Sequence, residues 1–94
     1  MSVTYDDIVS AQQEQGDVIR KTSLTFSDTF TQLTGSTVYL KNEFEQKTGS
    51  FKLRGAYYKI KTLSEEERKN GVVAASAGNH AQGVAYASAL EKIN

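Results

Sequence analysis

The chain has 94 residues, of which 38% are hydrophobic, and its eleven basic and eleven acidic residues give a formal net charge of zero at pH 7. This balance provides no field that would attract nucleic acid, an anionic membrane or an acidic substrate, and the absence of cysteine excludes disulfide frameworks, thiolate zinc sites and cysteine nucleophiles. With one histidine, no apolar run long enough to cross a bilayer and no signal-peptide pattern, we expect a cytoplasmic protein without a metal site.

The first predicted element is a short helix over residues 5–15. Thr4 and Asp7 have the spacing of a capping box, in which the side chain of each residue bonds the backbone N–H of the other. Gly16 is a plausible stop signal for this helix.

The next stretch, residues 17–36, is rich in threonine and serine and has no clear period. Within it, Ser27 to Leu33 suggests a short helix capped by Ser27 or Asp28. Val38 to Lys41 is a compact run with high β propensity and predicts a strand.

Two helices are predicted in the following part of the chain. The first carries an apolar stripe with steps of three and one residues, formed by Leu53, Ala56, Tyr57, Ile60 and Leu63. The second begins with a capping box at Ser64 to Glu67 and ends at Asn70 and Gly71.

The last part of the chain predicts a strand, a turn and a closing helix. Val72 to Ala75 is apolar on both faces, as a buried parallel strand is. A tight turn over residues 76–80 then leads into a helix whose small-residue face is Ala81, Val84, Ala85, Ser88 and Ala89.

The order strand, helix, helix, strand, helix predicts an α/β protein with a parallel sheet and helical crossovers. Two strands are too few for such a sheet, whose strands are normally covered on both faces. We therefore expect residues 1–94 to be part of a larger domain. The loops at 46–52 and 76–80 would both lie at the carboxyl ends of strands, where ligands bind in open α/β sheets.

Lys52 stands at the start of the helix in the first loop and has two interpretations. Ser50 could cap the helix, and the helix dipole and partial burial would then favour a neutral amine, which can form a Schiff base with an aldehyde. Taken alone, the stretch fits better an exposed lysine whose stem covers apolar surface. It is not a phosphate loop, because G-x-x-x-x-G-K-[ST] is absent.

The second loop, Ser76 to His80, combines a hydroxyl, a glycine, an amide and several backbone N–H groups at a helix start. Such a turn can bind a carboxylate. Taken alone, Asn79 could be only a helix cap and His80 only structural, and glycines such as Gly83 could serve turns and close packing. The two loops together favour a site.

These two loops resemble a known family. The stretches GSFKLRGA, from Gly49 to Ala56, and SAGNHAQG, from Ser76 to Gly83, are similar to the threonine dehydratase (threonine ammonia-lyase) and serine racemase branch of the pyridoxal-phosphate enzymes that share the tryptophan synthase β-like fold, fold type II. The resemblance covers nearly the whole chain. It implies a truncated part of a three-layer parallel-sheet domain, in which residues 1–94 are the N-terminal portion of a dehydratase catalytic domain.

The resemblance implies a role for each site residue. Lys52 would form the Schiff base with pyridoxal 5'-phosphate and later move the Cα proton, Phe51 would lie against the cofactor ring, and Asn79 would hydrogen-bond its 3-hydroxyl group. The turn that receives the substrate carboxylate would consist of Ser76, Gly78, Asn79 and His80. The implied reaction is β-elimination from threonine or serine, giving a 2-oxo acid and ammonia, as in isoleucine biosynthesis, by an enzyme that is a homo-oligomer at full length.

Two positions depart from the family pattern. Ala77 stands where serine racemases of this branch carry a second acid/base serine, which disfavours a racemase. Ser23 stands where the family commonly has proline, which loosens a turn without touching the chemistry. The glycine-rich loop that holds the cofactor phosphate in the family lies downstream of these residues, so we expect the 94-residue chain alone to be inactive.

Other functions remain open at the level of the sequence. The chain could be a non-catalytic module that folds or associates through unpaired strand edges, or part of an enzyme like serine racemase. A small nucleotide-binding domain is weakly supported, because the dinucleotide glycine fingerprint is absent.

Overall fold

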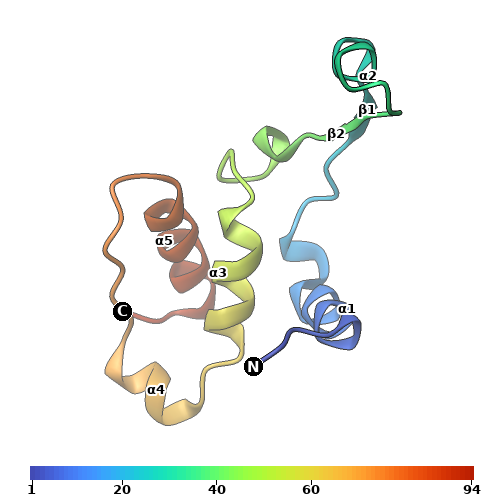
Figure 1. Ribbon diagram of the computed structural model, residues 1–94. Coiled ribbons are helices and arrows are strands. Elements are labelled where there is room, and N and C mark those ends of the chain that lie inside the picture. The colour runs from blue at the N-terminus through green and yellow to red at the C-terminus, as the bar shows by residue number, and fades with distance from the viewer.

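The computed structural model describes all residues from 1 to 94 and consists of a helical body and a projecting hairpin. In the body, α3 (Lys52–Lys61) and α5 (Asn79–Glu91) lie side by side, and α1 (Tyr5–Gln15) packs on α3 (Figure 1). The remaining elements, in chain order, are the 3₁₀ turn η1 (Gly16–Val18), β1 (Leu24–Phe26), α2 (Asp28–Thr34), β2 (Tyr39–Lys41), the 3₁₀ turn η2 (Glu43–Glu45) and α4 (Glu65–Asn70).

The helix starts follow the capping signals of the sequence. Thr4 forms both hydrogen bonds of a capping box with Asp7, and Ser64 does the same with Glu67. The Ser27 hydroxyl accepts a hydrogen bond from the Phe30 N–H at the start of α2. These three helices and the strand at β2 confirm the predictions, with differences of one residue at their ends.

The core is small and lies between α3 and α5. Leu53 is completely buried, and Tyr57 and Ile60 of the same predicted stripe are buried with it against Ala87 and Ile93. The predicted small-residue face of α5 is partly wrong. Ala85 and Ala89 are exposed, whereas the side of α5 that faces α3 carries Gly83, Ala87 and Ser88.

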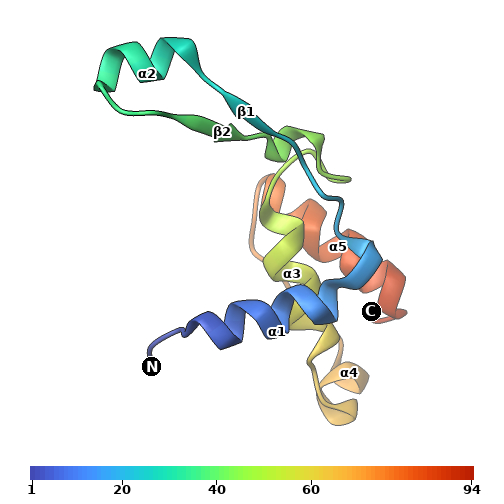
Figure 2. The same cartoon turned by 90° about the vertical axis from the view of Figure 1, so that its right-hand side faces the viewer.

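The only sheet is an antiparallel pair, in which Leu24 lies opposite Lys41 and Phe26 opposite Tyr39. The rings of Phe26 and Tyr39 meet edge to face with their centroids 5.6 Å apart. With α2 at its tip, this hairpin extends away from the helical body in both views (Figures 1 and 2). β1 is not among the predicted elements, because three residues within a threonine- and serine-rich stretch are too few to establish a period.

The predicted strand at Val72 to Ala75 is not formed, and no parallel pair is present. These residues run without regular structure, with Val73 fully exposed, and their one backbone bond joins the Val72 N–H to the Asn94 carbonyl. The reason is physical: a strand exists only with a partner for its N–H and C=O groups, and the hairpin lies at the other side of the body.

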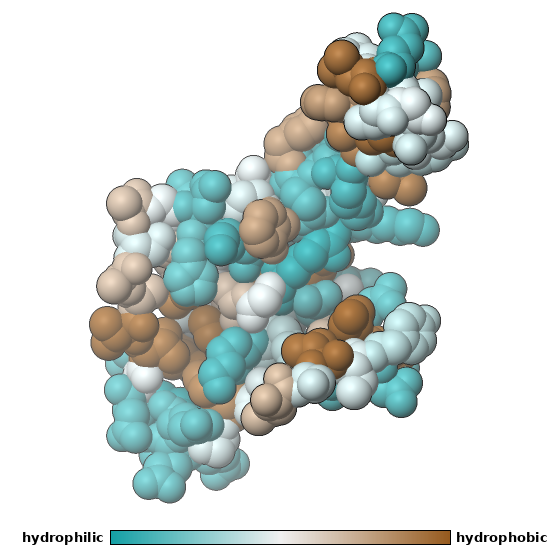
Figure 3. Space-filling model, in the orientation of Figure 1, coloured by the Kyte–Doolittle hydropathy of each residue, from teal (hydrophilic) through white to brown (hydrophobic).

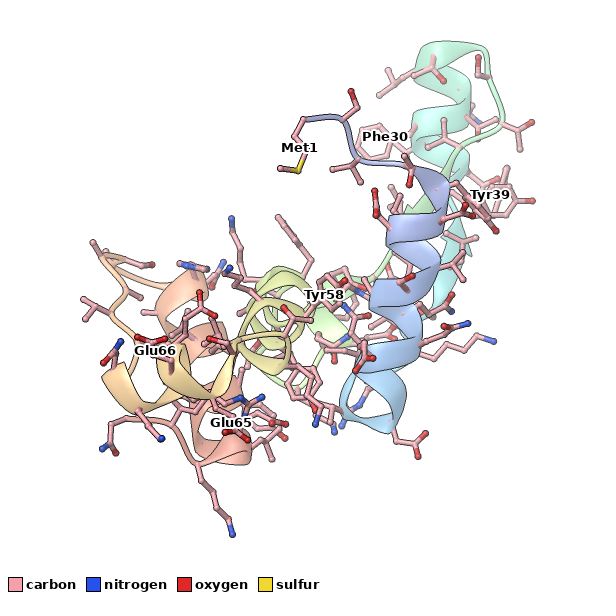
Figure 4. All side chains as sticks on the ribbon, turned by 90° about the horizontal axis from the view of Figure 1, so that it is seen from below. Met1, Phe30, Tyr39, Tyr58, Glu65 and Glu66 are labelled. Atoms are coloured by element: carbon pink, nitrogen blue, oxygen red, sulfur yellow. The ribbon has the colours of Figure 1, made fainter.

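The molecule is extended for its length. Its radius of gyration is 16.0 Å, whereas about 12 Å is typical of a compact domain of this size. Apolar side chains gather at the hairpin and beside α1 in Figure 3, and Figure 4 shows Phe30 and Tyr39 at the hairpin, away from Glu65 and Glu66 of α4. None of the helices has the length and apolar character needed to cross a bilayer.

Candidate functional site

Lys52 is the first residue of α3, and the start of this helix has no side-chain cap. The N-cap position is taken by Phe51, with helical backbone angles, so the predicted cap at Ser50 is wrong. Ser50 lies one residue too early to bond the first free N–H groups of the helix. Its hydroxyl is instead buried without a hydrogen-bond partner, as is the hydroxyl of Thr48.

The side chain of Lys52 is exposed, which corrects the expectation that it is partly buried. Its Nζ lies 5.2 Å from the centroid of the exposed Phe51 ring, a distance at which a cation is attracted to an aromatic face. Nζ takes part in none of the ion pairs of the chain. Nζ is therefore not paired with a carboxylate, and it lies next to an aromatic surface on which a flat ring could lie.

The second predicted loop leads into α5 with free backbone donors. The Ser76 hydroxyl accepts hydrogen bonds from the N–H groups of Gly78 (3.3 Å) and Ala81 (3.2 Å) and so holds the turn. Gly78 is the N-cap of α5, and the N–H groups of the next two residues, Asn79 and His80, donate no hydrogen bond within the chain. Two free N–H groups at the positive end of a helix fit a carboxylate.

The two loops meet in an open hollow of about 320 Å³, lined by Phe51, Lys52, Arg54, Gly55, Ala56 and His80. The structure thus brings three of the predicted site residues together, namely Phe51, Lys52 and His80. Ser76, Gly78 and Asn79 do not line this hollow, although they are joined to His80 through the turn.

Gly83 determines how closely α5 approaches the lysine. A Cβ atom at this position would lie 3.2 Å from the carbonyl carbon of Lys52 and 3.3 Å from the N atom of Leu53. These are backbone atoms, which move only with the whole first turn of α3. Close packing, one of the two roles considered for this glycine from the sequence, is therefore confirmed.

Arg54 connects the hollow to the base of the hairpin. Its Nε and Nη2 atoms donate to the two carboxylate oxygens of Glu43 at 2.9 and 2.8 Å, and Glu43 also accepts a hydrogen bond from the Thr22 hydroxyl. This bidentate bond with Arg54, aided by Thr22, lowers the pKa of Glu43 to about 2 although partial burial opposes the shift. Arg54 is not among the site residues predicted from the sequence, and its position two residues after Lys52 in the motif is the signal that points to it.

The lowered pKa of Glu43 predicts a pH-dependent contribution to stability. Because the folded-state pKa lies below the ordinary value of 4.5, the contribution is complete above that value and disappears as the pH falls toward 2. We expect Glu43→Gln to be less stable than the unmodified chain by about 1 kcal/mol at pH 7, a value reduced for solvent screening, and the difference to shrink toward pH 2. Urea unfolding at both pH values measures this, and a difference that persists at pH 2 contradicts it.

Most of the chain matches a known protein family. Residues 16–94 match the family described as pyridoxal-phosphate dependent enzyme. The chain belongs to this family. L-threonine ammonia-lyase of Thermotoga maritima is 58% identical over 88 residues, which are 94% of this chain and 22% of that protein. The catabolic L-threonine dehydratase TdcB of Escherichia coli K12 is 44% identical over 90 residues, which are 96% of this chain and 27% of that protein.

A solved structure confirms the fold class within the family. The serine racemase of Dictyostelium discoideum superimposes with a TM-score of 0.88 at 43% identity, over 98% of this chain and 30% of that one. The chain therefore has the fold of these fold type II relatives, and spans less than a third of the length of each of the three.

Proposed function

We propose that residues 1–94 form the N-terminal portion of the catalytic domain of a pyridoxal-phosphate-dependent threonine/serine ammonia-lyase. The observation that carries the proposal is the free amine of Lys52 beside the Phe51 ring, in the same hollow as His80 of the second loop. The names of the relatives from Thermotoga maritima and Escherichia coli support an amino-acid lyase.

The residues present fit pyridoxal 5'-phosphate at one side of the molecule. Lys52 offers the amine that would hold the cofactor aldehyde, and Phe51 offers an exposed aromatic face. Asn79, next to His80 at the start of α5, would supply a side-chain amide for the ring oxygen. When bound, the cofactor withdraws electrons from the substrate Cα.

The remaining roles in the reaction belong to side chains and backbone groups of the chain. The free N–H groups of Asn79 and His80, in the turn held by Ser76 and opened by Gly78, receive the substrate carboxylate. The Lys52 amine takes the proton from Cα, and the β-hydroxyl group then leaves with a proton. Hydrolysis returns the water, so threonine gives 2-oxobutanoate and ammonia.

The proposal is tested with a polypeptide that contains residues 1–94 together with the rest of the proposed catalytic domain, purified with the cofactor. This is called the longer polypeptide below. We expect it to release 2-oxobutanoate from L-threonine or pyruvate from L-serine, with a homo-oligomer in the cytoplasm as the working form. We expect the 94-residue chain alone to release neither. A cofactor-loaded polypeptide that only interconverts L- and D-serine would overturn the proposal in favour of a racemase, which Ala77 disfavours.

A second candidate concerns the 94-residue chain by itself, as a module that associates without catalysis. The observation in its favour is the apolar hairpin, whose exposed side chains include Leu24, Phe26, Phe30, Leu33 and Tyr39, because such surfaces and unpaired strand edges promote association. Sedimentation velocity tests it: a compact monomer unaffected by concentration and cofactor contradicts the candidate.

A further inference from the structure

The first turn of α3 carries the proposed reactive lysine but has little support of its own. The helix start has no side-chain cap, and the Arg54 N–H bonds the Phe51 carbonyl at 3.1 Å in a 3₁₀-type contact. Uncapped helix ends fray. Some other contact must keep Lys52 in one place if the hollow is to have a defined shape.

Arg54 supplies such a contact at both its backbone and its side chain. The Gln15 side chain at the end of α1 donates to the Arg54 carbonyl at 2.8 Å. At the other end, the guanidinium group forms the bidentate pair with Glu43 of η2, and the two side chains are 33% and 17% exposed. A partly buried pair of parallel hydrogen bonds of this kind fixes the orientation of the guanidinium group as well as its distance from the carboxylate.

Glu43 is itself held by the base of the hairpin, so the contact is not a loose surface pair. Thr22, which is 4% exposed, donates its hydroxyl to Glu43, and the Thr22 carbonyl accepts a 2.7 Å hydrogen bond from Lys41 Nζ. The nearby Gln46 bonds both backbone groups of Arg20, at 2.9 and 3.0 Å. The Glu43 carboxylate is therefore bonded to Thr22 at the base of the hairpin as well as to Arg54 of α3.

On the opposite side, Gly83 lets α5 touch the backbone of Lys52 directly. The first turn of α3 is thus held between α5, through Gly83, and the hairpin base, through Arg54 and Glu43. We propose that Arg54 is a positioning residue, which acts through this ion pair to hold the Lys52 amine at the hollow. This inference rests on the proposed function for its kinetic readout, but its structural readout is independent of it.

The experiment uses the longer polypeptide and the variants Arg54→Met and Arg54→Lys, the second of which keeps the charge but loses the pair of parallel hydrogen bonds. A displaced catalytic group slows the chemical step, so we expect kcat to fall about 10- to 100-fold in both variants. KM should change less than about threefold, because the carboxylate turn on α5 is untouched. A rise in KM with kcat unchanged, or kcat per folded molecule equal to that of the unmodified enzyme, overturns the proposal.

A double-mutant cycle separates positioning from general destabilisation. If Arg54 acts through Glu43, the double variant Glu43→Gln/Arg54→Met should be no slower than Arg54→Met alone, whereas independent effects would multiply. Arg68→Met is the matched control, since Arg68 pairs with Glu91 at 3.3 Å and bonds carbonyl groups at the far end of α3. It should lower stability and leave kcat per folded molecule unchanged.

A measurement without cofactor or substrate tests the positioning role of Arg54 separately from the proposed lyase function. In the cofactor-free polypeptide, Arg54→Met should speed hydrogen exchange at the Ala56 and Tyr57 amides at least about fivefold relative to those of Thr62 and Leu63. Equal acceleration along the whole of α3 would overturn the positioning role, whatever the enzyme's substrate. If exchange is faster in the first turn but the unmodified enzyme has no lyase activity, the positioning role of Arg54 is supported and only the proposed function is overturned.

Discussion

Lys52→Ala in the longer polypeptide should remove cofactor attachment and lower the release of 2-oxo acid from threonine at least about a thousandfold, because in the proposed function both the attachment and the Cα proton transfer would depend on one amine. Borohydride reduction followed by peptide mass spectrometry should fix the cofactor to residue 52 in the unmodified protein and to no residue in the variant. The visible absorbance of the bound cofactor should disappear in parallel.

Lys59→Ala is the matched control for this substitution. Lys59 is another exposed lysine on α3, one that does not line the hollow with Phe51 and His80. We expect its replacement to leave attachment and turnover unchanged. If Lys52→Ala keeps the visible band and the reduced cofactor is found on a different lysine, the assignment of Lys52 is wrong.

Leu53→Ala should have the largest effect on the stability of the chain. Leu53 is completely buried in a core of five side chains, and removing a buried leucine side chain costs about 2–5 kcal/mol. Since small domains have only about 5–15 kcal/mol in total, and this core is small, we expect the variant to be largely unfolded. Far-ultraviolet circular dichroism during urea unfolding measures the change.

Leu33→Ala provides the comparison within the same chain. The Leu33 side chain is 75% exposed at the end of α2, so its removal leaves no cavity and should change the free energy of unfolding by less than about 0.5 kcal/mol. Similar losses for the two leucine variants would mean that α3 and α5 do not form the core described here.

Helices could be predicted from the sequence because their signals are local. The capping boxes at Thr4 and Ser64, and the stripe that contains Leu53 and Ile60, lie within a few residues of the structures that they determine. Strands depend on partners that are distant in sequence. The run at Val72 to Ala75 has the composition of a buried strand, but no strand lies beside it to accept its hydrogen bonds.

The two loops of the candidate site could be predicted from the sequence. The contacts that support these loops could not. The motif around Lys52 and the turn at Asn79 each have recognisable residues, and the structure brings Lys52 and His80 to one hollow. The pairing of Arg54 with Glu43 could not be derived, because nothing in the spacing of an arginine and a glutamate on separate elements indicates that they meet. The start of α3 shows the same limit, since the suitable residue Ser50 lies beside the cap position without filling it.

The direct packing of α5 on Lys52 through Gly83 has a consequence for the segment between the two loops. Because the two helices are in contact, the distance between Lys52 and the turn proposed to bind the carboxylate is determined by the close packing at Gly83 and not by the length of the chain that joins them. The length of the connection through α4 therefore does not set this distance. The packing of the two helices, by contrast, leaves no room for a side chain at this point. A methyl group added at Gly83 would push α5 and the start of α3 apart and so change the spacing of the site.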